Sequence, residues 1–493
     1  MSETANIHSS LPSSIKVTIP SEHPSTPLST ILSRWSETLV SPPYVILTPT
    51  LPSDIPPIIA FARSQNLRLI PVNGGHASFV PITEKTLYLD LASPSFKTIT
   101  LNEEKQEVTF GGGSLTGEVV KELSRQGWYT LTANSDVVGM AGWFLGGGNS
   151  GMTGVHGFGI DHVHRIQMIP FTAPMNEAGE PNVLTLSRES AGAEKDLFNT
   201  LRGAGLGLGV ILSITLKAWQ ICTLNMTENK VWTRRLMFPG AGPNPGITTA
   251  ARLYKALLLP PPAMTAVLVF LRAPPTAPRP GSPIIMLALS YFGPSEDGKK
   301  FSAPTYGEEY TQHAVSVVEG FLAWENLNAS SAPLNAHGGF KEYHGAFCHE
   351  VSEESIVEAY KTWEVFTAKN LAGRGTSYLV IGSWGTDQLV QNASKHDDKM
   401  SPARDRGVFV QVVPWCKDSE DKGEADVFGR KATSALREAD RKEGRKDWHF
   451  ANNLRAGQNL EDVWTDEQIQ RIREVKGVWD KDGVGWNPAV EGW

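Results

Sequence analysis

Pro71-Val72-Asn73-Gly74-Gly75-His76-Ala77-Ser78 follows an apolar run, Leu67 to Val72, that has the residue types of a buried strand. The glycine pair lets the backbone turn with positive φ and approach a ligand closely. Consecutive N–H groups in such a turn form a cradle for a phosphate, and His76 stands at its mouth. A single Gly-Gly-His is weak evidence, so its meaning depends on the sequence that follows.

Three more glycine-rich turns follow in order: Gly111 to Gly113, Gly139 to Gly148, and Arg202 to Val210. Each alone is typical of a tight turn. Together they indicate a backbone laid against a large, flat ligand. The last one contains Gly-x-Gly, but the strand-like residues after it, where a dinucleotide fingerprint needs a helix, disfavour a nicotinamide-binding Rossmann domain.

The hydrophobic pattern predicts mixed helices and strands. A helix is expected over Ser53–Asn66 and another over Asp466–Lys476, which Gly477 can end. Glycine and small residues dominate from Thr130 to Gly159, so neither helix nor strand interiors are expected there. Strands are expected at Met264–Leu271 and Ile284–Tyr291, and central strands at Tyr378–Gly382 and Val408–Val413.

Composition excludes several classes of protein. The 493 residues carry a net charge of -7, which argues against a nucleic-acid partner. No apolar run approaches the ~18 residues of a membrane span, so no membrane partner is expected. The cysteines Cys222, Cys348 and Cys416 show no CxxC spacing, which predicts neither a disulfide framework nor a metal site. With no evident signal peptide, a cytoplasmic location is expected.

The motifs taken together carry a family resemblance. The order GGH, VGxxGxxxGGG (from Val138), DLFxxLRGAGxxxGVI (from Asp196) and RIREVKGVWDKDGVGWN (from Arg471) resembles the berberine-bridge-enzyme-like branch of the vanillyl-alcohol-oxidase flavoproteins. Ser401–Trp415, with Pro402 and Arg404, resembles a motif and strand of that family's substrate domain.

The resemblance implies an α+β fold with two domains. It comprises an N-terminal extension (1–34), a PCMH-type FAD-binding domain (35–222), a substrate-binding domain (223–445) with an antiparallel sheet flanked by helices, and a C-terminal segment (446–493) that returns to the FAD domain.

FAD is the cofactor that the resemblance implies, with His76 matching the histidine bonded to the flavin 8α-methyl group. Ser135 stands where many members have a second, cysteinyl link, so a single covalent tether is expected. The other residues expected to contact FAD are Asn73, Gly74, Gly75, Ala77, Ser78, Ser135, Val138, Gly139, Gly142, Gly146, Gly147, Val210, Ile211 and Asn452.

The catalytic base is the point where this chain departs from the family that it resembles. Asn453 stands where some relatives have a basic tyrosine, and Gln411 stands where others have a glutamate. An amide cannot accept a proton at neutral pH. The nearest titratable candidates are Tyr343, His344 and Asp405. Two tryptophans are expected to wall an apolar substrate pocket, and these are Trp384 and Trp415.

The resemblance predicts an FAD-dependent oxidase. A hydride passes from a small, largely apolar metabolite to flavin N5, and dioxygen reoxidises the flavin to give hydrogen peroxide, in secondary-metabolite biosynthesis that can include oxidative cyclisation. The absent bases also suit a redox-neutral cyclase or isomerase that uses the FAD-lined cavity as a template for pericyclic or proton-transfer chemistry. A non-catalytic binding protein is a third alternative.

Overall fold

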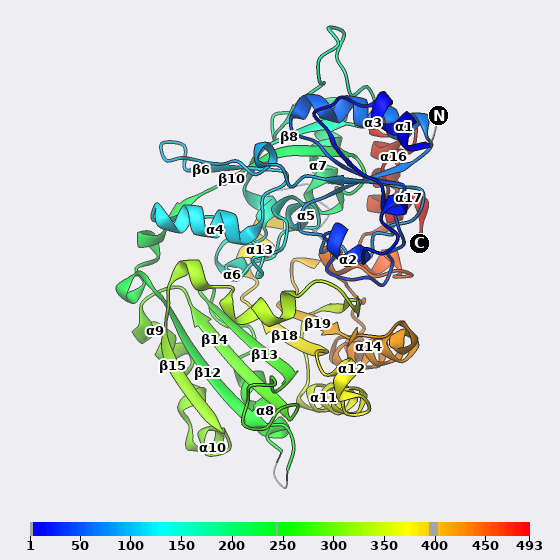
Figure 1. Ribbon diagram of the computed structural model, residues 1–493. Helices are drawn as coiled ribbons and strands as arrows, with labels where there is room; N and C mark the ends of the chain where they lie inside the picture. Colours follow the sequence, from blue (N-terminus) through cyan, green and yellow to red (C-terminus); the bar gives the residue numbers. More distant parts are fainter. Residues whose placement is uncertain (1–2, 243–244, 394–402) are drawn as a thin grey trace.

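The computed structural model describes residues 3–242, 245–393 and 403–493. Residues 401 and 402, which open the segment that resembles the substrate-domain motif, lie outside these ranges. Figure 1 shows two parts stacked on each other, with both ends of the chain beside α16 in the upper part. Helices and antiparallel sheets are mixed throughout, which confirms the expected α+β class.

The first sheet contains the strand that leads into the Gly-Gly-His turn. Its order is β1-β2-β4-β3, with β2 and β3 parallel to β4 and β1 antiparallel to β2. Residues 3–34 take part, because β1 pairs with β2 and Ile15 and Ile19 are buried in the same core. Helix α3 (Ile55–Ser64) covers the sheet, and Ile55, Ile58, Ile59 and Ala62 on its inner face are fully buried. The strands are β1 (Lys16–Thr18), β2 (Val45–Thr48), β3 (Arg68–Val72) and β4 (Thr86–Asp90).

The second sheet is antiparallel and has the order β5-β6-β10-β8-β9. The second glycine turn (Gly111–Gly113) follows β6, and the fourth (Arg202–Val210) leads from α7 into β10. Two helices accompany the second sheet, α4 (Thr116–Arg125) and α7 (Gly192–Ala204). The strands of the sheet are β5 (Ile99–Asn102), β6 (Glu107–Gly111), β8 (Val163–Pro170), β9 (Leu184–Leu186) and β10 (Gly209–Lys217).

Two of the sequence-based expectations are wrong. The glycine-rich stretch contains two short helices, α5 (Met140–Leu145) and α6 (Thr153–His156). Met140 and Phe144 are fully buried, so apolar burial at helical spacing outweighs the low helix propensity of the flanking glycines. Helix α16 (Asp466–Trp479) also runs through Gly477. Its last turn is held by a hydrogen bond from Thr172 N to Trp479 O of 2.8 Å.

The third large sheet is antiparallel, with seven strands in the order β15-β12-β14-β13-β18-β19-β17. Helices α8 (Ile247–Ala256), α11 (Glu353–Ala368) and α14 (Lys422–Leu436) cover one face, as Figure 1 shows. This arrangement confirms the expected antiparallel sheet flanked by helices. The strands are β12 (Val231–Pro239), β13 (Met264–Arg272), β14 (Pro283–Tyr291), β15 (Ser316–Leu322), β17 (His344–Cys348), β18 (Tyr378–Ser383) and β19 (Val408–Val413).

A buried ion pair joins residues of the two parts. The Arg404 guanidinium donates to both carboxylate oxygens of Asp161, at 2.9 and 2.6 Å, and Asn392 Nδ2 donates to the same carboxylate at 2.9 Å. Burial alone would raise the pKa of Asp161, but the hydrogen bonds and charge of Arg404 hold it below its usual value. No described helix is long and apolar enough to cross a bilayer.

Candidate functional site

A cavity of about 1360 Å³ lies between the glycine turns and the uncovered face of the seven-stranded sheet. We call the part lined by residues of the segments 34–35, 69–80, 112, 130–152, 205–211 and 451–453 the turn half. The part lined by residues of the segment 235–417 is the sheet half. Most of the residues expected at the site line it, namely Asn73, Gly75, His76, Ala77, Ser135, Val138, Gly139, Gly142, Gly146, Ile211, Tyr343, Trp384, Gln411, Trp415, Asn452 and Asn453.

Six expected site residues do not line the cavity: Gly74, Ser78, Gly147, Val210, His344 and Asp405. Val210 pairs with Ile169 in the second sheet, and its side chain is fully buried in the core that this sheet shares with the first. Gly74 packs against the Val137–Gly139 backbone. Asp405 has a half-exposed side chain, 3.3 Å from the Arg406 guanidinium.

The Gly-Gly-His turn places an imidazole against the turn half. Gly75 has φ +68°, and a methyl group there would overlap the carbonyl oxygen of Ser33. Trp35 N donates to Gly75 O at 3.1 Å. The His76 ring stacks on Trp35, with centroids 5.6 Å apart, and meets His337 edge-on at 5.5 Å. Only glycine fits this turn, and the turn fixes the position of His76.

The surroundings of His76 keep its imidazole neutral. Burial lowers the pKa of His76 well below its ordinary value, and the positive charges of His337, Lys341 and Arg34 lower it further. Its Nε2 atom has no hydrogen-bond partner. A neutral imidazole with an unused ring nitrogen can act as a nucleophile at neutral pH.

Lys341 lies where the two halves meet. Its Nζ is 4.5 Å from the Trp35 ring centroid and 3.8 Å from that of Trp415, so the cation is held between two aromatic faces. It donates to Ala336 O at 2.5 Å. Burial lowers the pKa of Lys341 to about 7, against a weaker opposing effect of Glu37.

Asparagine amides connect separate segments of the turn half. Asn73 Nδ2 donates to Gly112 O at 3.0 Å, which joins the first two glycine turns. Asn452 Nδ2 donates to Gly142 O at 3.1 Å, which joins the C-terminal segment to α5. A side chain at Gly146 would overlap the Asn452 amide. The turn half is therefore a wall of backbone fixed by polar side chains.

Polar atoms without partners gather around the cavity. A buried polar atom that lacks a hydrogen bond costs about 1–3 kcal/mol, so a group of them at one cavity is typical of a polar ligand site. A large ligand with many acceptors and donors, such as FAD, fits this set. The atoms are Arg34 Nε, His76 Nε2, Ser135 Oγ, Trp384 Nε1, Asn452 Oδ1 and Asn453 Nδ2.

The sheet half is formed by alternate residues of the strands, because successive side chains in a strand point to opposite faces. It is largely apolar, with Trp384 packed on Phe409 (centroids 5.8 Å apart) where the two halves meet. Gln411 lies on the same face. Sequence reasoning missed most of this wall, although the period-2 pattern of its strands carried the signal. The residues are Thr265, Val267, Val269 and Leu271 of β13, Met286, Ala288 and Ser290 of β14, and Val380 and Gly382 of β18.

No described residue that lines the cavity is an aspartate or a glutamate. Tyr343 stacks on Trp35 with centroids 4.7 Å apart, and burial raises the pKa of its hydroxyl above the ordinary value. Gln411 and Asn453 are neutral amides. The described lining therefore offers neither a carboxylate base nor an activated tyrosine.

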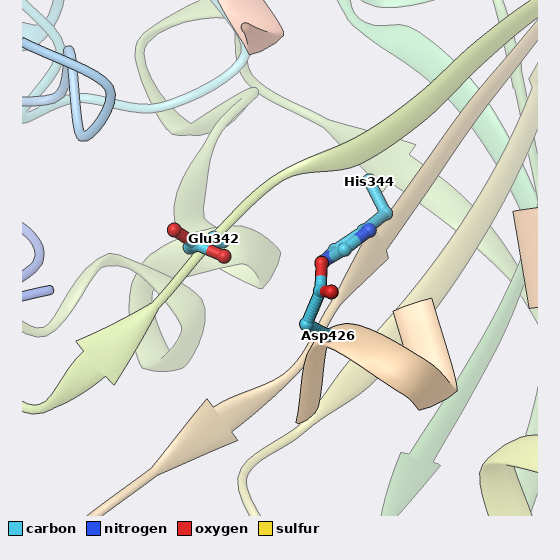
Figure 2. A group of neighbouring side chains, drawn as sticks. All are labelled: Glu342, His344 and Asp426. Atoms are coloured by element: carbon cyan, nitrogen blue, oxygen red, sulfur yellow. The ribbon is translucent and has the colours of Figure 1, made fainter. Parts of the chain in front are cut away.

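His344 belongs to a different group of side chains, shown in Figure 2 with its imidazole pointing toward Asp426. Glu342, His344 and Asp426 lie close enough to share a metal ion, but Asp426 Oδ2 already pairs with Arg430 Nε at 2.7 Å. Arg455 Nη1 lies 3.7 Å from the other oxygen. Burial and these two arginines lower the pKa of His344 to about 3. The arginines balance the carboxylates, and none of the three residues lines the cavity.

Comparisons with known proteins agree with this geometry. Residues 43–170 match the FAD binding domain family. FAD-linked oxidoreductase hasG of Aspergillus fumigatus is 24% identical over 92% of each chain. Wild-type BBE-like 1 of Physcomitrella patens has a similar fold, with a TM-score of 0.74, 14% identity and 97% of each chain covered. Glucooligosaccharide oxidase of Acremonium strictum, described with a 6-S-cysteinyl, 8α-N1-histidyl FAD, has a TM-score of 0.68 and 16% identity, with 93% of this chain and 94% of that chain covered.

Proposed function

Since this chain belongs to the berberine-bridge-enzyme-like family of FAD-linked oxidoreductases, with a PCMH-type FAD-binding fold, we propose that it is an oxidase with FAD bound covalently to His76. The substrate is a small, largely apolar metabolite, and dioxygen is the electron acceptor. The observation that carries the proposal is the neutral His76 imidazole, whose Nε2 atom has no partner at the wall of a large cavity.

The turn half holds the cofactor in this proposal. When bound, FAD supplies the redox chemistry: it accepts a hydride at N5 and returns the electrons to dioxygen, which forms hydrogen peroxide. The backbone of the Gly-Gly-His turn presents N–H groups to the pyrophosphate. Further contacts come from Asn73, Gly75, Ala77, Ser135, Val138, Gly139, Gly142, Gly146, Ile211 and Asn452, with Gly74 packed against the Val137–Gly139 backbone behind them.

His76 is the only covalent tether in this proposal. The Acremonium oxidase is described with a cysteinyl and a histidyl link, whereas this chain has Ser135 in the turn half, and a hydroxyl is a far poorer nucleophile than a thiol. Ser135 Oγ has no partner among the described residues, so it is free to hydrogen-bond to the cofactor.

The sheet half positions the substrate. Trp384 and Trp415 provide apolar walls that exclude water, and the Gln411 amide can donate a hydrogen bond to a substrate oxygen. Neither Gln411 nor Asn453 accepts a proton at neutral pH, so both amides position the substrate and do not act as the base.

One observation favours the redox-neutral cyclase or isomerase as a second candidate. The described residues that line the cavity include no carboxylate base. Such a cavity suits a reaction in which the protein does not have to remove a proton, such as a pericyclic ring closure on a template. Tyr343 then contributes shape alone, because burial raises the pKa of its hydroxyl.

The reaction with oxygen separates the two candidates without knowledge of the substrate. The purified holoenzyme is photoreduced under anaerobic conditions and mixed with air-saturated buffer. An oxidase reoxidises much faster than free reduced flavin and releases one hydrogen peroxide per flavin. Reoxidation no faster than that of free flavin would contradict the proposal. Metabolite profiling with and without active protein then identifies the substrate, which must bleach the flavin absorption anaerobically.

A further inference from the structure

Arg235 is a charged residue on the otherwise largely apolar open face of the seven-stranded sheet. Its neighbours across the strands are Ala288 of β14 and Val318 of β15. Met237 and Met286 occupy the next row of the same face. The Arg235 side chain is exposed and lines the same cavity as His76.

The adjacent residue, Arg234, is an arginine with a structural role, and its contacts differ from those of Arg235. Arg234 points to the opposite face, where its guanidinium donates to Thr305 Oγ1 at 2.8 Å and to Glu319 Oε2 at 3.0 Å. Tyr306 stacks on it, with the ring centroid 3.6 Å away. Arg235 has no such hydrogen bond, ion pair or ring contact among the described residues. Its side chain, which lines the cavity, is not committed to another side chain of the described protein.

The charges lining the cavity have one sign. Four cationic residues and no carboxylate line it among the described residues. Arg34 is committed to the carbonyls of Ala77 and Val80, and Arg272 to Thr367. Of the four cationic side chains, those of Arg235 and Lys417 make no hydrogen bond or ion pair with the described residues. Lys417 follows the last residue of the short strand β20 (Trp415–Cys416), and its side chain is exposed.

Arg235 lies in line with the place where the two halves meet. Its row on the open face continues through Ala288, Val267 and Gly382 to Phe409, which packs on Trp384. Four strand-to-strand steps separate β12 from β19, which is roughly 19 Å at the usual spacing. The intervening surface offers apolar side chains and no charge. A ligand that touches both ends must therefore be long and apolar in its middle.

We propose that Arg235 anchors the carboxylate of an elongated, largely apolar substrate whose other end reaches Trp384 and Gln411. A guanidinium is the side chain that pairs best with a carboxylate, through two parallel N–H···O bonds. The two methionines beside it adapt to the shape of an apolar chain. The identity of this ligand as the substrate rests on the proposed function, but the binding site does not.

Equilibrium binding to the holoenzyme tests the site without turnover. Decanoate, decan-1-ol and decyltrimethylammonium are titrated separately below their micelle concentrations, with calorimetry as the readout. These ten-carbon chains are shorter than the row from Arg235 to Phe409, so they test the Arg235 end of the site. Decanoate is expected to bind more tightly than decan-1-ol, and the ammonium compound most weakly. Arg235→Gln is expected to weaken decanoate binding about 10- to 100-fold and to leave decan-1-ol binding unchanged. Arg235→Lys restores part of the preference.

Two control variants show whether the carboxylate preference belongs to Arg235. Arg252→Gln removes an exposed arginine of α8, whose nearest carboxylate is 3.8 Å away, and leaves every affinity unchanged. Lys417→Gln leaves the decanoate preference intact. The proposal is overturned if wild-type protein does not prefer decanoate, if Lys417→Gln rather than Arg235→Gln removes the preference, or if Arg235→Gln weakens decan-1-ol equally. Because oxygen reactivity is measured separately, failure here leaves the oxidase proposal standing.

Discussion

The two halves of the cavity are built from different kinds of structure. The turn half is mostly backbone, bent by glycines and fixed by the amides of Asn73 and Asn452. The sheet half is mostly side chains that alternate along regular strands. A backbone wall tolerates almost no substitution, whereas a side-chain wall can change residue by residue while the sheet stays intact. The comparison teaches that the turn half can keep one ligand while substitutions in the sheet half change the specificity for a second ligand.

The largest expected effect comes from the turn half. Gly75→Ala places a methyl group against Ser33 O at a residue with positive φ, so the Gly-Gly-His turn cannot form and the protein is expected to purify without flavin. The flavin absorbance per protein measures this. Gly127→Ala is the matched control, since Gly127 also has positive φ (+78°) but open space around it. If both variants lost flavin equally, backbone strain rather than the close approach would be responsible.

The next largest effect is expected at the ion pair that holds the two parts of the molecule together. Arg404→Gln leaves the Asp161 carboxylate buried without its partner and is expected to lower the free energy of unfolding by about 3–5 kcal/mol. Because the pair keeps the pKa of Asp161 low, its stabilisation is present above the ordinary aspartate pKa and is lost as the pH falls.

Denaturation by urea at pH 7 and pH 4 checks this expectation. Arg430→Gln is the control, because Arg430 makes a more exposed pair with Asp426 that is worth at most about 1 kcal/mol. Equal losses of unfolding free energy in the two variants would show that the buried pair contributes no more to stability than the exposed one.

Lys341, where the halves meet, gives a pH-dependent effect. Its pKa is about 7 in the folded protein and near its ordinary value when unfolded, so the unfolded state binds more protons between these values. Stability is therefore expected to rise with pH from about 7 to 10, by at most about 1.4 kcal/mol per unit. Thermal unfolding of wild type and Lys341→Met over this range measures the slope. A slope unchanged in the variant would refute the assignment to Lys341.

The smallest effect on folding is expected in the sheet half. Ala288→Leu adds volume to the open face, opposite Val267 and Arg235, without entering the covered core. Flavin content and unfolding temperature should stay close to wild type, while decanoate affinity changes. Leu287→Ala, the neighbouring residue on the covered face, should instead cost about 2–5 kcal/mol. A loss of flavin in Ala288→Leu would mean that the two halves are not independent.

The contrast between a backbone wall and a side-chain wall explains which features could be predicted from the sequence. The glycine turns were recognisable because a close backbone approach demands glycine at a fixed place, and the structure brings most of them to one cavity. The helices at α5 and the end of α16 were missed because burial outweighed local propensity. Arg34 and Trp35 carry no local signal of a site, and their positions depend on contacts with residues distant in sequence. For Arg235, the alternation of side chains along β12 shows only which residues share its face of the sheet. Its position at the cavity depends on the pairing of five strands, which the sequence pattern does not show.

The central claim is that the turn half holds FAD through His76 alone. Tryptic digestion of the denatured holoenzyme should release residues 69–85 as one peptide, because Arg68 and Lys85 bound it. Mass spectrometry is expected to find the flavin on His76 of this peptide and on no other, and His76→Ala should release all flavin on acid precipitation. Free FAD from the acid-precipitated wild-type protein, or flavin on a different peptide, would contradict the account.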